Sequence, residues 1–255
     1  MFRDNPLKAQ IAAGKPVVGC WSHLVSPAAA EILALSGYDF VIIDNEHGPT
    51  SLSDSTILMM AVSTTPAATL MRVPWNDPVY IKRALDTGIE GLMIPAVEDA
   101  EAAQSAVAAC RYPPEGIRGV AYAVTRAAEY GLKRKEYAEK ANDNLLVMCQ
   151  VESAKTVDNI EEIGAVDGID VLFIGPFDLS ASMGKPGQFD DPEVAETLDR
   201  AEARILASGK TLGAIVRPGD SVASMVERGY GLIVSASDAT LLRDAAGADV
   251  KAARG

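Results

Sequence analysis

Two acidic residues stand just after apolar runs of this chain, and their placement is its strongest chemical signal. The run at 147–151 leads into Glu152, and the run at 171–174 is followed within four residues by Asp178. Buried strands rarely end in a bare carboxylate, because an ionised carboxylate without a partner inside a protein is energetically costly. If the two strands are near neighbours in a parallel sheet, both carboxylates emerge at the same edge. Two oxygen ligands with further coordination positions left open predict a site for a divalent cation.

Helix capping is the alternative explanation for the same two residues. Asp is a good N-cap and Glu a poor one, so capping accounts for Asp178 more readily than for Glu152. The residues Gly175, Pro176 and Phe177 form a tight turn before Asp178, and the backbone N–H groups of this turn suit a carboxylate held beside a metal. Two such acids on adjacent strand–helix units favour the metal site.

His47 is the candidate for acid–base chemistry. It is one of two histidines and is followed by Gly48 and Pro49, which place it in a loop. Asp44 lies three residues earlier and would orient the imidazole ring and raise its basicity. A lone histidine is more often structural or merely exposed. His23, the other histidine, follows the first predicted strand and is a possible wall of the same pocket.

Arg72 ends an apolar segment, where a guanidinium needs an anionic partner. That partner is either a structural aspartate or a substrate oxygen whose negative charge grows in the transition state. By contrast, the sequence around Asp86 indicates only a solvated helix residue.

The positions of these residues follow from a repeated strand–loop–helix unit. Helices are expected at 26–37, from 53, at 77–87, at 99–110 and at 239–250, and strands at 17–21, 40–44, 69–73, 91–95, 145–151, 171–174, 212–216 and 232–235. About eight such units predict a single (β/α)8 barrel over residues 1–255, with a long excursion at about 111–144. An open doubly wound sheet competes, but no glycine-rich fingerprint follows the first strand. Trp21, Gln150 and Arg217 also fall at strand ends, where barrel enzymes hold their active sites.

The composition limits the partners. A net charge of -12 argues against nucleic acid, whose binding depends on neutralising phosphates. No apolar stretch approaches the roughly 20 residues that span a bilayer, and the first residues lack the apolar core of a signal peptide. Three cysteines without a C-x-x-C pair indicate a reducing compartment, so a cytoplasmic location is expected.

Together these segments resemble one enzyme family. The similarity lies in 44–49 (DNEHGP), 111–119 (RYPPEGIRG), 150–152 (QVE) and 174–180 (IGPFDLS), within a match from about 19 to 243. The chain resembles the HpcH/HpaI aldolases, which are metal-dependent class II pyruvate aldolases. Within that family it is most similar to members that act on 5-dehydro-4-deoxyglucarate and 4-hydroxy-2-oxoheptanedioate.

The resemblance implies a fold, an assembly and a reaction. It implies a TIM barrel whose C-terminal helix is exchanged between subunits of a homo-hexamer, a dimer of trimers. The reaction is reversible cleavage of a 4-hydroxy-2-oxo acid, including keto acids derived from sugar acids, to pyruvate or hydroxypyruvate plus an aldehyde. It proceeds through an enolate on Mg, Mn or Co, with Zn less favoured.

The resemblance also implies roles for individual residues. Glu152 and Asp178 would bind the metal, His47 would accept the proton and Arg72 would stabilise the transition state. Asp86 matches a position that raises the basicity of the histidine, and Asp44 belongs to the same catalytic group. The substrate pocket would comprise Trp21, Gln150, Gly175, Pro176, Phe177, Asp178 and Val216.

Three departures from the family pattern flank the expected pocket, and three rival functions stay open. Asn45 replaces glycine, His23 replaces a smaller residue and Phe177 replaces alanine or serine, so the family pattern does not determine the aldehyde preference. A Schiff-base aldolase would need a lysine inside the barrel, and no lysine falls mid-strand. An acyl-CoA lyase or phosphoenolpyruvate enzyme would need a basic groove, for which the excursion offers Arg118, Arg126, Lys133, Arg134 and Lys135. The third rival is a catalytically inactive barrel that serves as a binding protein.

Overall fold

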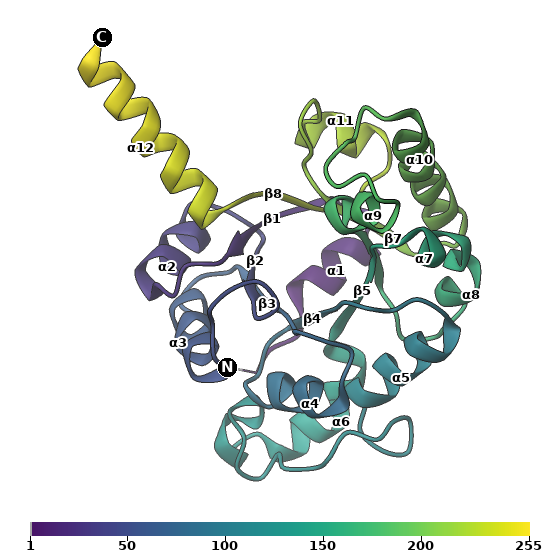
Figure 1. Ribbon diagram of the computed structural model, residues 1–255. Helices are drawn as coiled ribbons and strands as arrows, with labels where there is room; N and C mark the ends of the chain where they lie inside the picture. Colours follow the sequence, from purple (N-terminus) through teal and green to yellow (C-terminus); the bar gives the residue numbers. More distant parts are fainter. Residues whose placement is uncertain (1) are drawn as a thin grey trace.

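Eight parallel strands close into a barrel in the computed structural model, which describes residues 2–255 (Figure 1). Each strand pairs with the next, and the last pairs with the first. The predicted single (β/α)8 barrel is therefore confirmed. The strands are β1 (Val17–Ser22), β2 (Phe40–Asp44), β3 (Ala68–Arg72), β4 (Gly91–Ile94), β5 (Leu146–Val151), β6 (Val171–Ile174), β7 (Thr211–Ile215) and β8 (Leu232–Ser237).

Alternation along each strand separates two cores. Side chains at every second position, such as Phe40 and Ile42 of β2, pack inside the barrel. The intervening residues, such as Val41 and Ile43, pack outward against the helices. Both faces of each strand are thus apolar, which explains why the strands read as continuous apolar runs. Gly19 leaves the space inside the barrel that the Phe40 ring fills.

Helices surround the barrel, and the expected Ser-Pro and Asp-Pro signals start several of them. Ser26 accepts a hydrogen bond from the backbone N–H of Ala29 and Asp77 from that of Val79, each just before a proline at the first helical position. The helices are α2 (Pro27–Leu35), α3 (Leu52–Val62), α4 (Pro78–Asp86), α5 (Ala100–Cys110), α7 (Ala154–Asp158), α8 (Ile160–Gly164), α9 (Pro176–Ser182), α10 (Pro192–Ala207), α11 (Val222–Glu227) and α12 (Asp238–Arg254).

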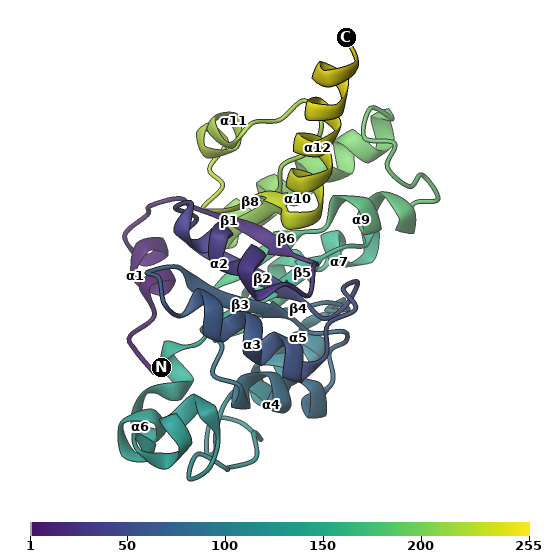
Figure 2. The same ribbon diagram turned by 90° about the vertical axis from the view of Figure 1, so that its left-hand side faces the viewer.

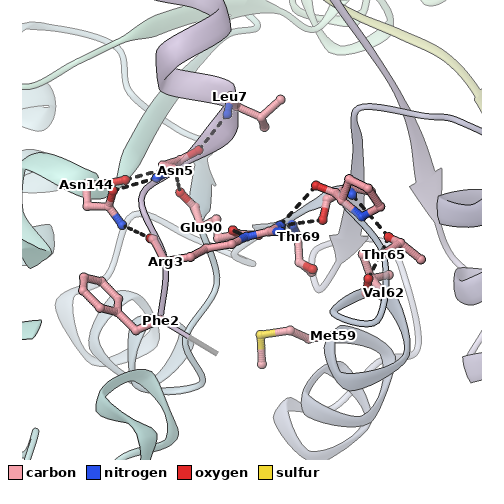
Figure 3. A network of polar contacts seen from close by, with 12 residues as sticks. Phe2, Arg3, Asn5, Leu7, Met59, Val62, Thr65, Thr69, Glu90 and Asn144 are labelled. Atoms are coloured by element: carbon pink, nitrogen blue, oxygen red, sulfur yellow. Dashed lines mark hydrogen bonds and ion pairs between the residues drawn. The ribbon is translucent and has the colours of Figure 1, made fainter. Parts of the chain in front are cut away.

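The amino-terminal end of the barrel is closed by the start of the chain. A short helix that the sequence analysis did not predict, α1 (Pro6–Ala12), inserts Leu7 into the interior core. Before it, Arg3 forms an ion pair with Glu90, and Asn5 donates to the backbone carbonyl of Glu90 and to that of Asn144 (Figure 3). These contacts leave the carboxyl ends of the strands as the open end.

The excursion at 111–144 folds beside this closed end, below the barrel in Figure 2. It contains a 3-10 segment, η1 (Arg126–Gly131), and α6 (Arg134–Asn144). Tyr112 and Tyr137 belong to its own small core. The excursion is therefore an addition that packs away from the carboxyl ends of the strands.

The last helix, α12, does not lie along the barrel wall. It projects away from the barrel in both views (Figures 1 and 2), and Asp238 is its buried residue. Leu242, in contrast, is 62% exposed. Across residues 2–255, none of the helices has the length and apolar character needed to cross a membrane.

Candidate active site

A cavity of about 790 Å³ opens at the carboxyl ends of the strands and collects most of the predicted site residues. Inward-facing strand positions supply several of them, because Trp21, Arg72 and Gln150 continue the alternation that fills the barrel interior. The predicted residues that line this cavity are Trp21, His47, Arg72, Gln150, Gly175, Pro176, Phe177, Asp178 and Val216.

Asp44 lies behind the cavity wall, fully buried, and binds side chains at the ends of the two neighbouring strands, β1 and β3. Its Oδ1 and Oδ2 accept from Nε (2.9 Å) and Nη2 (2.6 Å) of Arg72, which is its direct register partner on β3. Oδ2 also lies 3.0 Å from Nε2 of His23, and Oδ1 accepts from the backbone N–H groups of Glu46 and His47. Burial alone would raise the pKa of Asp44, but the hydrogen bonds from His23 and Arg72 hold it well below its usual range.

Arg72 therefore has a structural partner and also faces the cavity. Of the two alternatives that the sequence left open, the structural aspartate is present and is Asp44. The guanidinium carbon lies 4.4 Å from the centre of the Trp21 ring, so the ring packs against the guanidinium group while Asp44 binds two of its nitrogen atoms. Its Nη1 lies 3.0 Å from Oε2 of Glu46. The arginine is thus held in one orientation at the cavity wall.

Glu46 is a site residue that the sequence analysis did not single out. Within residues 2–255, its Oε2 accepts no hydrogen bond despite the ion pair with Arg72. Burial raises the pKa of Glu46 to about 7; the charge of Arg72 opposes this rise, and the charges of Glu152, Asp44 and Asp178 add to it. The signal in the sequence was its place between Asp44 and His47 in the loop after β2.

Glu152 follows β5 and is held by groups from both sides. Its Oε1 accepts from the backbone N–H of Ala96 (2.7 Å), and its Oε2 accepts from Nε2 of Gln150 (2.8 Å). Ala96 has a positive φ of 56°, a strained conformation for alanine that aims its N–H at this carboxylate. Burial, and then the nearby charge of Asp178, raise the pKa of Glu152 although the Ala96 N–H opposes this. The two predicted metal ligands therefore lie close enough to repel each other.

The donor set fits a weakly held, oxygen-ligated cation. The charges of Glu152 and Asp178 are mutually unfavourable, the charges of both raise the pKa of Glu46, and Oε1 of Gln150 is buried without a hydrogen-bond partner among the described residues. A divalent cation would relieve this repulsion. No group of three or more His, Cys, Asp or Glu side chains in residues 2–255 is arranged as a metal site. The protein would thus supply few ligands, unlike a closed structural zinc site.

The histidine ring that contacts Asp44 is not the one that the sequence suggested. His47 lines the cavity and is exposed, but only its backbone N–H contacts Asp44. The imidazole that contacts Asp44 is that of His23, which also lines the cavity. Both residues line the cavity, and His23 has a larger part in the site than its sequence context indicated.

Asp86 and the basic residues of the excursion lie away from this cavity. Asp86 ends α4, and its Oδ1 accepts from Nη2 of Arg118 (2.9 Å). Arg118 is 4% exposed and stacks on Tyr112, and Nη1 of Arg126 donates to the backbone carbonyl of Thr87. One chain alone therefore does not bring Asp86 to His47, and these arginines do not form a groove beside the cavity.

Known proteins resemble this chain over nearly its whole length. Residues 17–245 match the sequence model described as HpcH/HpaI aldolase/citrate lyase. A protein of Escherichia coli, 4-hydroxy-2-oxo-heptane-1,7-dioate aldolase, is 39% identical over 243 residues, which cover 95% of this chain and 92% of that one. The crystal structure of an HpcH/HpaI aldolase/citrate lyase family protein from Burkholderia cenocepacia J2315 superposes with a TM-score of 0.92 at 38% identity, covering 98% of this chain and 100% of that one. The HpcH/HpaI aldolase from Desulfitobacterium hafniense DCB-2 gives 0.87 at 32%, covering 97% and 96%. This chain belongs to the HpcH/HpaI aldolase/citrate lyase family.

Proposed function

We propose that this enzyme is a metal-dependent aldolase that reversibly cleaves a 4-hydroxy-2-oxo acid to pyruvate or hydroxypyruvate plus an aldehyde. The observation that carries the proposal is the meeting of a fixed guanidinium, a loop histidine and Asp178 at one cavity. Glu152 lies behind the cavity wall, where it accepts a hydrogen bond from Gln150 and lies near the charge of Asp178. The name of the E. coli relative supports this reaction class.

Arg72 stabilises the charge that develops during cleavage. Breaking the C3–C4 bond moves electrons toward the keto oxygen of the acid, and a guanidinium held by Asp44 and Trp21 needs no reorganisation to meet that charge. Gln150 and the backbone around Phe177 contact the pyruvyl group. The buried, unpartnered Oε1 of Gln150 supports a polar contact at this end of the cavity.

His47 accepts the proton of the 4-hydroxyl group during cleavage and returns it during addition. Its exposure to the cavity supports this role. Asp44 contributes through Arg72 and the loop backbone. Asp86 would act on the histidine only across a subunit boundary, because its carboxylate binds Arg118 within the chain.

Glu152 and Asp178 would hold the divalent cation, Mg, Mn or Co in preference to Zn. When bound, the cation would supply positive charge beside the carboxylate and keto oxygens of the acid. The test is pyruvate release from 4-hydroxy-2-oxo-heptane-1,7-dioate by EDTA-treated enzyme, with and without added Mn²⁺. Glu152→Gln and Asp178→Asn should lose Mn²⁺ binding in a direct titration while keeping the fold, and Glu101→Gln, on the surface of α5, serves as the control. Turnover that survives EDTA would refute the metal requirement.

The Schiff-base alternative has little support. Among residues 2–255, none of those lining the cavity is a lysine. Borohydride treatment in the presence of pyruvate should therefore leave the mass of the protein unchanged, and a covalent adduct would count against the metal mechanism.

The projecting helix supports an assembly in which copies of the chain exchange α12. Its exposed apolar residues Leu241, Leu242 and Val250 have no core to join within one chain. We infer a homo-hexamer, a dimer of trimers, in the cytoplasm, where the buried free cysteines would stay reduced. Light scattering should give six times the 26.8 kDa chain mass, and Leu242→Glu should lower it. A monomeric wild type would exclude the exchange.

A further inference from the structure

One ring nitrogen of His23 contacts Asp44, and the other has no hydrogen-bond partner among the described residues. Its Nε2 faces Oδ2 of Asp44 at 3.0 Å, and an ionised carboxylate only accepts hydrogen bonds, so Nε2 carries the proton. No hydrogen bond to its Nδ1 is found in the part of the chain that the structure describes. In the neutral ring, Nδ1 is therefore an acceptor, and any polar contact of this ring with the contents of the cavity goes through it.

The ring lies directly beside the reacting groups. His23 and Arg72 bind the same oxygen atom, Oδ2 of Asp44, so the imidazole and the guanidinium are neighbours. The Trp21 ring contacts both, with its centre 4.4 Å from the guanidinium carbon and 5.8 Å from the centre of the His23 ring. The side chain of His23 is 31% exposed and lines the cavity. A substrate that reaches Arg72 with its keto oxygen therefore lies beside His23 as well.

The positive charges around the cavity are already paired. Arg72 is paired with Asp44 and Glu46, as described above. Nε of Arg217 lies 3.1 Å from Oδ2 of Asp220, and Nε of Arg243 lies 2.7 Å from Oδ1 of Asp244. Within residues 2–255 the cavity wall thus presents no unpaired arginine or lysine to a carboxylate at the far end of an aldehyde.

We propose that His23 is a specificity-determining residue whose Nδ1 accepts a hydrogen bond from a hydroxyl group on the aldehyde part of the substrate. The enzyme accordingly favours neutral, hydroxylated aldehydes over apolar and over acidic ones. This inference rests on the aldolase function proposed above, and it concerns only the aldehyde half of the reaction.

The experiment compares two nearly isosteric aldehydes with pyruvate as donor and Mn²⁺-loaded enzyme. Glycolaldehyde carries a hydroxyl where propanal carries a methyl group. In His23→Phe the ratio of kcat/KM for glycolaldehyde to that for propanal should fall roughly three- to ten-fold below the wild-type ratio, as expected for one hydrogen bond at a half-open site. His23→Gln, which keeps a donor for Asp44 and an acceptor for the substrate, should restore the ratio. Ser63→Ala, which removes an exposed hydroxyl at the end of α3 and outside the cavity lining, should leave it unchanged.

A second readout separates failure of this inference from failure of the proposed function. Exchange of the pyruvate methyl protons with solvent deuterium needs no aldehyde. If the wild type exchanges these protons but His23→Phe slows both aldehydes equally, His23 has only a structural role and the inference is overturned. If the wild type neither exchanges nor adds either aldehyde, the aldolase function fails and the role of His23 with it. Should His23→Phe not fold, the wild type decides alone: a higher kcat/KM for succinate semialdehyde than for glycolaldehyde overturns the preference.

Discussion

Glu46 should make the stability of the metal-free enzyme depend on pH, and Glu46→Gln should remove that dependence. Because burial raises the pKa of this carboxyl from 4.5 to about 7, the folded state binds the proton more tightly than the unfolded state does. Stability from this group is complete below pH 4.5 and is lost as the pH rises through 7. Each unit of difference between the folded and unfolded pKa corresponds to about 1.4 kcal/mol, so the full effect of Glu46 on the free energy of unfolding is about 3 kcal/mol. Since the side chain is 19% exposed, solvent screening makes this an upper limit.

The assay is urea unfolding of wild type and Glu46→Gln in EDTA at fixed protein concentration, from pH 4.5 to 8. The wild-type free energy of unfolding minus that of the variant should fall by up to about 3 kcal/mol over this range. Glu196→Gln, at an exposed position of α10, should give a difference that does not change with pH. A difference for Glu46→Gln that stays constant or grows with pH would refute the reasoning.

Three further substitutions test the packing and the site. Asp44→Asn should lower the free energy of unfolding by about 3 kcal/mol, because it leaves the buried guanidinium without its main anion; a loss below 1 kcal/mol in urea unfolding would contradict this. Arg72→Lys should lower kcat for pyruvate release roughly 100-fold, because an ammonium cannot hold both carboxylate oxygens and also face the substrate; a kcat within three-fold of wild type would show that the planar group is dispensable. Gly19→Ala should destabilise the barrel by about 1–3 kcal/mol, because its methyl group would overlap the Phe40 ring. An unchanged melting temperature for Gly19→Ala would mean that the ring can move aside.

The sequence predicted the barrel well because its strands are short apolar runs with clear breaks between them. It did not predict α1, whose seven residues are too few for a periodic pattern and which is stabilised by Leu7 in a distant core. It placed Asp44 and Arg72 at strand ends correctly, but not their contact, since register partners in a parallel sheet cannot be read along one strand.

The sequence predicted which residues stand at the ends of strands, but not how their side chains are arranged. Spacing suggested that Asp44 orients the His47 ring, whereas the ring in contact is that of His23, which follows the adjacent strand β1. Glu46 has no distinctive pattern, and the charges that act on its pKa belong to residues at the ends of several strands. The role of Asp86 came only from resemblance, and a single chain places it against Arg118.

The five donors that meet on Asp44 affect how activity in cell extracts should be interpreted. The same carboxylate orients the arginine and ties the ends of β1, β2 and β3 together. Variants around it are therefore expected to lower the amount of folded enzyme as well as its turnover. A screen that measures product per volume of lysate would attribute both losses to catalysis. Specific activity per mole of folded, purified protein is the quantity that separates them.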